Sequence, residues 1–238
     1  MANISDSWKP LAHSPIQRLS ENLWRVEGTI PRMSLKRVMT IVRHSDGCLI
    51  FHSPIILDDA SIREVETWGT PSFLLVPSGY HRMDSPAYKK RYPSIRVFAP
   101  KGSRKKIEEV ISVEGTYEEF PKGGAAELAP LPGVDDTEGV MLVHSNDGVT
   151  VVLNDVVMNM DRKRDLLGFL FTTVLGSAPG PRVSRLSQLL MVKDKPALRA
   201  ELERLSSLPN LVRLIVSHEK IATGDEARLA LRTAAAYL

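Results

Sequence analysis

The chain has 238 residues, of which 43% are hydrophobic and 25% are charged, with a formal net charge of +3. This composition is ordinary for a globular protein, and the length fits one large domain or two small ones. The basic residues form short clusters that acidic residues soon follow, so we do not expect a nucleic-acid partner. The N-terminus has no basic, apolar leader, and the longest apolar run is too short to span a bilayer. We therefore expect a cytoplasmic protein without a membrane span.

Hairpins and short strands dominate the predicted elements of the first half of the chain. Alternating or continuous apolar residues indicate strands, and Asp46-Gly47 is typical of a tight turn between two of them. Helices are expected where a capping residue precedes an amphipathic stretch, as at Asp58. In chain order, we expect strands at 23–28, 38–43 and 49–52, a helix at 58–68, a strand at 73–76, a helix at 85–92, a strand at 95–99 and a helix at 102–110.

The second half begins with a loop rich in Pro and Gly, which contains one short strand. We then expect a hairpin at 140–153, helices at 161–175, 183–191 and 195–208, a strand at 211–217 and a helix at 225–237. Hairpins in both halves argue against an all-parallel sheet. We expect two mixed sheets face to face with helices outside. The apolar segment Leu166 to Leu175 is expected to be a buried helix of the outer layer, the alternative being an oligomer surface.

Polar side chains follow four of the predicted strands at the points where the chain leaves the sheet. His52, Asp155 and His218 end apolar runs, and His81 lies in the loop after another strand. Layered α/β folds bind ligands at such strand exits, and imidazole with carboxylate is typical of metal sites. No nucleophile-elbow, P-loop or dinucleotide motif is present in the sequence. The pattern therefore favours a metal site built from residues far apart in the chain.

The order and spacing of these elements resemble the metallo-β-lactamase fold, an αββα sandwich, across nearly the whole chain, residues 1–238. The resemblance rests on His52-Ser53-Pro54, the loop from Pro77 to Asp84, Pro132-Gly133-Val134, Asn154-Asp155 and Ser217-His218. In that superfamily these positions carry an Asp-x-Gly turn, a histidine-rich metal loop, a Pro-Gly-His turn, a bridging aspartate and a final histidine. The resemblance implies one four-layer domain with a metal site at the same rim.

Several ligands of a two-metal site are replaced here. Ser78, Tyr80 and Val134 stand where the resemblance implies histidines, and Arg82 or Met83 stands where it implies an aspartate. A guanidinium near a dication costs electrostatic repulsion. The chain therefore resembles a divergent branch of the superfamily, and a standard two-zinc hydrolase is not expected.

The first functional hypothesis is a one-metal hydrolase of a small-molecule ester, lactone or phosphoester. One Zn, Mn or Fe ion would be held by some of His52, His81, Asp155 and His218, with Asp155 as ligand or proton acceptor. For His52 we favour a role in orienting other residues over a role as fourth ligand. Arg82 and Tyr80 are candidates for substrate binding.

The second hypothesis is a non-catalytic member of the fold that acts as a binding or assembly module, such as a homo-oligomer. Arg82 and Tyr80 would then fill the pocket, and Leu166 to Leu175 would contact a partner. The two hypotheses differ in whether the side chains of His81, Asp155 and His218 surround one point that Arg82 leaves free.

Overall fold

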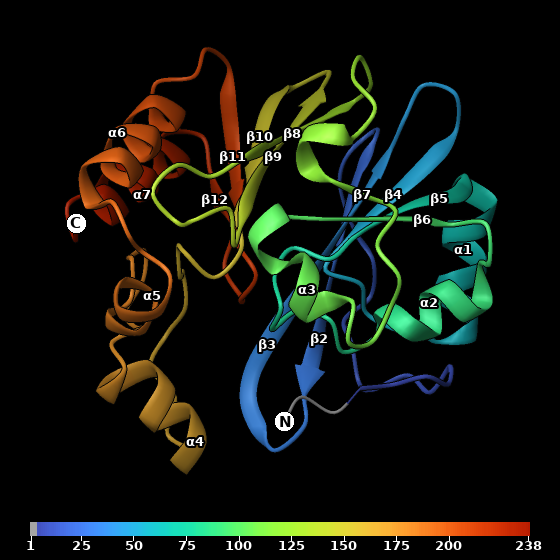
Figure 1. The fold of residues 1–238 in the computed structure, drawn as a ribbon, viewed down its shortest axis with the longest axis horizontal. Helices are drawn as coiled ribbons and strands as arrows, with labels where there is room; N and C mark the ends of the chain where they lie inside the picture. Colours follow the sequence, from blue (N-terminus) through green and yellow to red (C-terminus); the bar gives the residue numbers. More distant parts are fainter. Residues whose placement is uncertain (1–3) are drawn as a thin grey trace.

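Strands from the first half of the chain form one sheet of seven strands in chain order. A computed structural model describes residues 4–238 and is shown in Figure 1. Adjacent strands are antiparallel as far as the fourth, and the fourth to seventh are parallel. This sheet A comprises β1 (Gln17–Ser20), β2 (Leu23–Ile30), β3 (Met33–Arg43), β4 (Cys48–His52), β5 (Thr70–Leu75), β6 (Arg96–Ala99) and β7 (Gly115–Thr116).

The second half forms sheet B, whose strand order is β12-β11-β10-β9-β8. The predicted hairpin of residues 140–153 is present as β9 and β10, and β10 pairs with β11 in parallel. All other pairs in this sheet are antiparallel. Sheet B comprises β8 (Ala126–Pro130), β9 (Gly139–Ser145), β10 (Gly148–Val152), β11 (Leu211–Ile215) and β12 (Ala222–Thr223).

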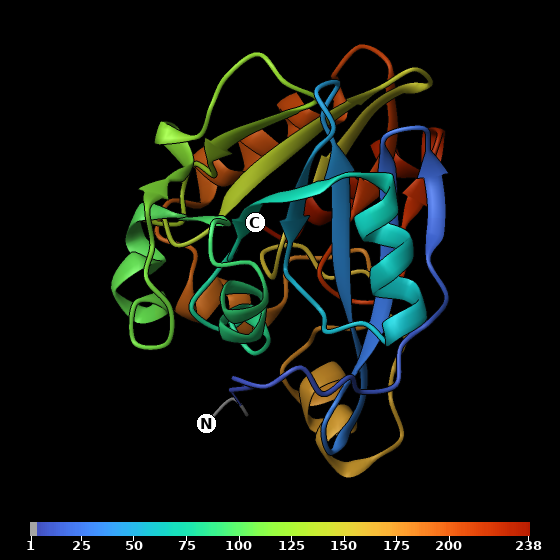
Figure 2. The ribbon, with the colours of Figure 1, turned by 90° about the vertical axis from the view of Figure 1, so that its right-hand side faces the viewer.

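Apolar side chains hold the two sheets together and attach helices to their outer faces. Ile50, Leu75 and Phe98 of sheet A share one buried cluster with Met141 and Val152 of sheet B. Figures 1 and 2 show helices on the outer side of each sheet. Sheet A is flanked by α1 (Asp59–Trp68), α2 (Ser85–Arg91) and α3 (Arg104–Ile107), and sheet B by α6 (Lys195–Ser206) and α7 (Asp225–Ala235). The expected αββα sandwich is thereby confirmed.

The helices between β10 and α6 differ from those expected. The helix predicted at 161–175 begins only at Leu166, because the Asp165 side chain accepts a hydrogen bond from the Gly168 amide at 2.9 Å and caps it. It consists of α4 (Leu166–Phe169) and a π-helical turn (Leu170–Val174), and α5 (Arg185–Leu190) follows. Within residues 4–238, no helix is long and apolar enough to cross a membrane.

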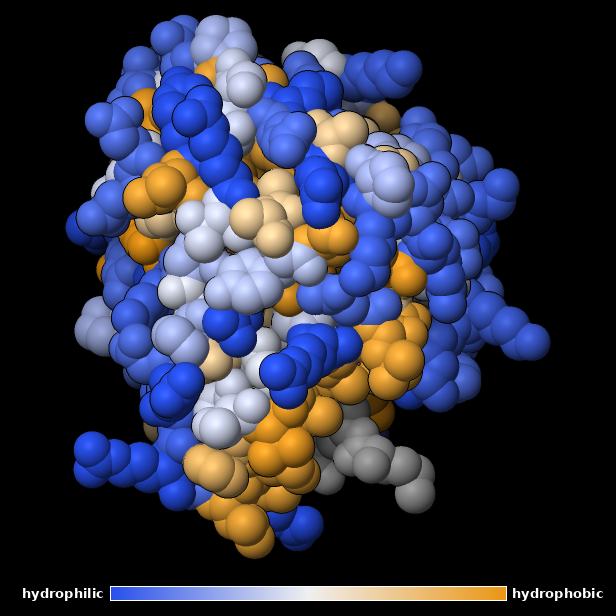
Figure 3. Space-filling model, turned by 90° about the vertical axis from the view of Figure 1, so that its left-hand side faces the viewer, coloured by the Kyte–Doolittle hydropathy of each residue, from blue (hydrophilic) through white to orange (hydrophobic). Residues whose placement is uncertain are grey.

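The prediction that Leu166 to Leu175 forms a buried outer-layer helix is wrong. Leu166 is 83% exposed, and Figure 3 shows hydrophobic side chains gathered at the lower end of that face. The reason is position: this segment lies beside the end of the β2–β3 hairpin, where Asp165 accepts a hydrogen bond from Ser34, and not across a sheet face. The exposed residues, which we call the α4–α5 patch, are Leu166, Leu167, Phe169, Leu170, Val174, Leu189 and Leu190.

A buried ion pair fixes the loop between β5 and α2. Asp84 ends this loop, and its Oδ2 lies 2.6 Å from Nη2 of Arg37 on β3 and accepts a hydrogen bond from the Ile56 amide at 2.9 Å. Arg37 Nε also donates to the Thr29 carbonyl at 3.2 Å. Because both charged groups are buried, each needs the other, and the loop is held against sheet A.

Replacing Asp84 by Asn should therefore destabilise the protein strongly, since it leaves the buried guanidinium of Arg37 without a counter-charge. The expected loss is about 3 kcal/mol in the free energy of unfolding, measured by urea denaturation. Glu64→Gln is the matched control, because Glu64 pairs with Arg18 at 2.7 Å on the surface, and it should cost less than about 1 kcal/mol. Equal effects of the two substitutions would contradict the prediction.

Candidate metal centre

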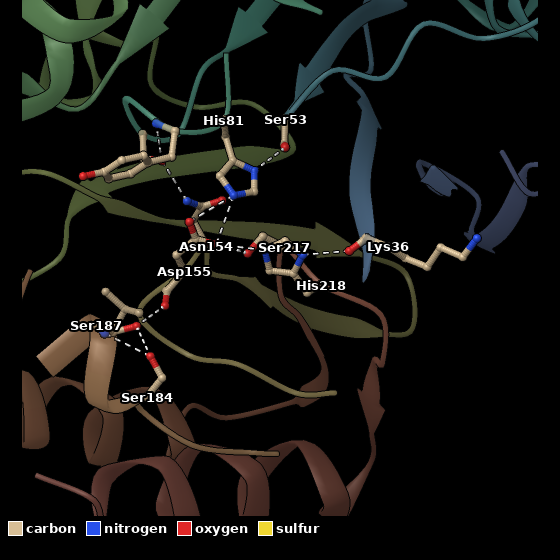
Figure 4. A network of polar contacts seen from close by, with 12 residues as sticks. Lys36, Ser53, His81, Asn154, Asp155, Ser184, Ser187, Ser217 and His218 are labelled. Carbon is tan, nitrogen blue, oxygen red and sulfur yellow. Dashed lines mark hydrogen bonds and ion pairs between the residues drawn. The ribbon is translucent and has the colours of Figure 1, made fainter. Parts of the chain in front are cut away.

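Three of the four predicted metal-site residues meet at one point between the two sheets. His81 lies in the loop after β5 of sheet A, whereas Asp155 and His218 follow the parallel neighbours β10 and β11 of sheet B. One ligand atom from each lies within 4.8 Å of the others. Figure 4 shows the three side chains pointing toward one another. Apolar strands therefore deliver these polar residues to a common rim.

The carboxylate of Asp155 occupies the middle of this cluster. His81 Nε2 lies 3.0 Å from both carboxylate oxygens, and His218 Nε2 lies 3.3 Å from Oδ1. The Ser217 hydroxyl donates to Oδ1 at 2.7 Å. Two imidazoles and a hydroxyl thus face one partly buried carboxylate.

Both imidazoles are held from behind by their other ring nitrogen. His81 Nδ1 lies 3.1 Å from the Ser53 hydroxyl, and His218 Nδ1 donates to the Lys36 carbonyl at 2.7 Å. Since the carbonyl can only accept, Nδ1 of His218 carries a proton and Nε2 is directed at Asp155. Such contacts orient histidine ligands in metal sites.

Electrostatics within the cluster favours an ionised Asp155 beside a protonated His218. Burial by itself raises the pKa of Asp155, but the charge of His81 and the hydrogen bonds from His218 and His81 outweigh it and hold the pKa well below its usual range. Burial lowers the pKa of His218, but the hydrogen bond to Asp155 and its charge outweigh it and raise the pKa overall. A proton or a metal cation on Nε2 satisfies the same requirement for positive charge beside the carboxylate.

A buried carboxylate that the sequence did not identify positions this aspartate. Glu138 Oε1 accepts hydrogen bonds from the Asn154 side chain at 2.7 Å and the Asp155 amide at 3.0 Å, and Oε2 accepts from the Val156 amide at 3.0 Å. Burial and the charge of Asp155 raise the pKa of Glu138. Glu138 follows Asp135, Asp136 and Thr137, and an acidic stretch of this kind is usually exposed. The sequence therefore gives no sign that Glu138 is buried.

His52 is buried at the end of β4 but lies outside the three-residue cluster. Burial, and to a lesser extent the charge of His81, lowers its pKa to about 3. It therefore stays neutral under ordinary conditions. His52 is not one of the three residues whose ligand atoms lie within 4.8 Å of one another, and its orienting role stays a prediction.

The two residues predicted to bind substrate lie in different places. Tyr80 is 69% exposed and lines the cavity beside His81 and His218. Arg82 turns away, with its guanidinium 2.8 Å from Glu109 and hydrogen-bonded to the Lys106 carbonyl of α3. The partners of Arg82 explain the difference, because Lys106 and Glu109 hold its guanidinium away from the cavity that Tyr80, His81 and Met83 line. Arg82 thus neither fills the cluster nor lines the cavity.

The residues fit a single divalent cation better than a pair. Two imidazoles and a carboxylate are suitable ligands for zinc, manganese or iron, and three protein ligands leave positions open for water or substrate. Val134 is packed in the core beneath sheet B, so its position offers no donor atom. The Ser78 hydroxyl accepts a hydrogen bond from the Asn154 side-chain amide at 3.3 Å.

Replacing Glu138 by Gln should destabilise the protein, because a Gln amide group would face an N–H donor that now has an acceptor. We expect a loss of about 1–3 kcal/mol in the free energy of unfolding, from urea denaturation. Glu119→Gln is the control: Glu119 also accepts a backbone hydrogen bond, from Thr116 at 2.7 Å, but on the surface. A loss at Glu138 no larger than that at Glu119 would show that the buried network is unimportant.

Buried neutral His52 should make the protein sensitive to acid. Between pH 6.5 and about 3 the unfolded chain binds a proton at His52 that the folded chain does not, so stability falls as the pH drops. The slope from this residue is at most about 1.4 kcal/mol per pH unit. Urea denaturation from pH 7 to pH 4 should therefore show a shallower decline for His52→Gln than for wild type. Parallel curves for the two proteins would show that His52 is not held neutral by burial.

Comparison with known proteins identifies the fold. No family model matches the chain, and no curated protein matches it in sequence. A crystal structure of the DIM-1 metallo-β-lactamase exposed to ceftazidime is similar, with a TM-score of 0.62 over 96% of this chain and 99% of that one, at 12% sequence identity. The protein is therefore a member of the metallo-β-lactamase fold.

Proposed function

We propose that the protein is a one-metal hydrolase of a small-molecule ester, lactone or phosphoester. The observation that carries this proposal is the convergence of His81, Asp155 and His218, from two sheets, on one point beside an open cavity. A purely structural polar cluster would not need to border a cavity of about 320 Å³. A cytoplasmic location remains a prediction.

The residues have distinct roles in this proposal. A bound divalent ion would supply Lewis acidity toward a carbonyl or phosphoryl oxygen and increase the acidity of water. His81 and His218 would hold it through Nε2, with Ser53 and the Lys36 carbonyl fixing the rings. Asp155 would be the third ligand or the acceptor of the proton that the attacking water loses. Tyr80, at the cavity mouth, would contact substrate.

A second candidate function is an assembly module that has lost catalysis. The α4–α5 patch favours it, because exposed leucines at neighbouring helix positions are typical of contact surfaces. We take the partner in this case to be a second copy of the chain. Bound metal is expected for the hydrolase and not for the assembly module, so the metal content separates the two candidates.

The metal content of the purified protein, measured by inductively coupled plasma mass spectrometry, tests the first proposal. We expect about one equivalent of metal per chain, which His81→Gln and Asp155→Ala abolish together with any esterase, lactonase or phosphodiesterase activity. His52→Gln is the matched control, since it removes a neighbouring buried imidazole that lies outside the cluster, and it should keep the metal.

Two results would contradict the proposal. Absence of metal after incubation with zinc, manganese and iron would leave the assembly function, which sedimentation analysis of the wild type and of Leu166→Asp would then examine. Metal that persists in both His81→Gln and Asp155→Ala would show that the ion is bound elsewhere.

A further inference from the structure

Two adjoining cavities meet at the three-residue cluster, one with charged side chains in its wall and one that is mainly apolar. The first, of about 320 Å³, is lined by Arg32, Arg37 and Ser53 together with apolar residues such as Ile30 and Met83, and we call it the polar chamber because it holds the two arginines. The second, of about 280 Å³, which we call the apolar chamber, is lined by Leu35, Met158, Phe171, Leu186 and Leu190. His81 and His218 line both, as does Tyr80.

The apolar chamber is built by several segments, of which only Phe171 belongs to the stretch predicted to be a buried helix. The π-helical turn contributes Phe171 and α5 contributes Leu186 and Leu190, while Leu35 and Met158 form the opposite wall. An apolar cavity of about 150 Å³ is enough to bind benzene, so this chamber has room for an alkyl chain. Its methionines can adjust to the shape of such a chain.

The polar chamber offers charge on the other side of the same cluster. Arg37 is neutralised by Asp84 at 2.6 Å. Arg32 at the tip of the β2–β3 hairpin is exposed, and it has no ion-pair partner among residues 4–238. A polar or anionic group in this chamber would therefore meet an unneutralised guanidinium.

We propose that the apolar chamber binds the acyl chain of an amphiphilic ester, whose polar alcohol part occupies the polar chamber. The inference rests on the proposed hydrolase function and specifies its substrate. The ester carbonyl would then lie beside His81, Asp155 and His218, where the two chambers join. In the reaction, water oxygen bonds to the acyl carbon, the ester C–O bond breaks, one proton goes to the alcohol oxygen, and the acid releases the other.

Binding of fatty acid anions to the full chain tests the chamber without requiring turnover. Isothermal titration calorimetry with hexanoate, octanoate and decanoate, with and without EDTA, should show affinity rising about fourfold per methylene until the chamber is full. Decanoate should thus bind at least tenfold more tightly than hexanoate. Equal affinities across the series would overturn the proposal.

Two adjacent leucines of α5 provide a matched pair of variants. Leu190 lines the apolar chamber and is 52% exposed, whereas Leu189 is 77% exposed and lies outside the chamber. Since both are on the surface, neither substitution should prevent folding. Leu190→Asp should weaken decanoate binding at least tenfold, because packing an alkyl chain against the new carboxylate would strip it of water, and Leu189→Asp should not. Equal weakening by both would show a general surface effect and overturn the proposal.

The same measurements distinguish failure of this inference from failure of the hydrolase proposal. Chain-length dependence and sensitivity to Leu190→Asp in a protein that binds no metal would support the acyl chamber and refute the hydrolase. One equivalent of metal with hydrolysis of short esters, but no preference for longer chains, would support the hydrolase and overturn the acyl chamber.

Discussion

The largely buried carboxylate of Asp155, 14% exposed, is the constraint on which the centre depends. A carboxylate removed from water is stable only if positive charge or hydrogen-bond donors surround it. Here the donors come from both sheets: His81 from the exit of β5, and Ser217 and His218 from the exit of β11. The cluster therefore links the two halves of the sandwich at their rim. Because each donor is itself held by a second contact, the geometry is fixed before any ligand arrives.

Two fully buried carboxylates, Asp84 and Glu138, hold the segments that carry His81 and Asp155. Asp84 secures the loop that carries His81 by pairing with Arg37, and Glu138 secures the turn that carries Asp155 by accepting three hydrogen bonds. These acidic groups are not interchangeable. Asp84 lies beside a fixed cation and acts as an anchor, whereas Glu138 has no cation beside it, so burial and the neighbouring Asp155 raise its pKa. The same residue chemistry serves two kinds of support.

Sequence patterns predicted the strands and the residues at their exits, because apolar runs that end in His or Asp carry a local signal. They could not identify Glu138, since its burial depends on the turn at Asn154, which follows the neighbouring strand β10. They also failed for Leu166 to Leu175 and for Arg82. In both cases the surroundings are set by tertiary structure: the leucines lie at the rim, and Arg82 is bound by the Lys106 carbonyl on α3 and by Glu109 just after it.

The positions at which the resemblance implied further ligands have each acquired another structural use. Val134 belongs to the apolar core beneath sheet B, Ser78 is bonded to Asn154, and Tyr80 forms part of the wall of both chambers. Restoring a histidine at Val134 would place an imidazole in close-packed apolar surroundings, at a cost in stability. A change at Ser78 would disturb the network that holds Asp155. The centre is thus committed to three donors by the packing around it, and the exposed Tyr80 is the position at which the cavity has the most freedom to adapt to a ligand.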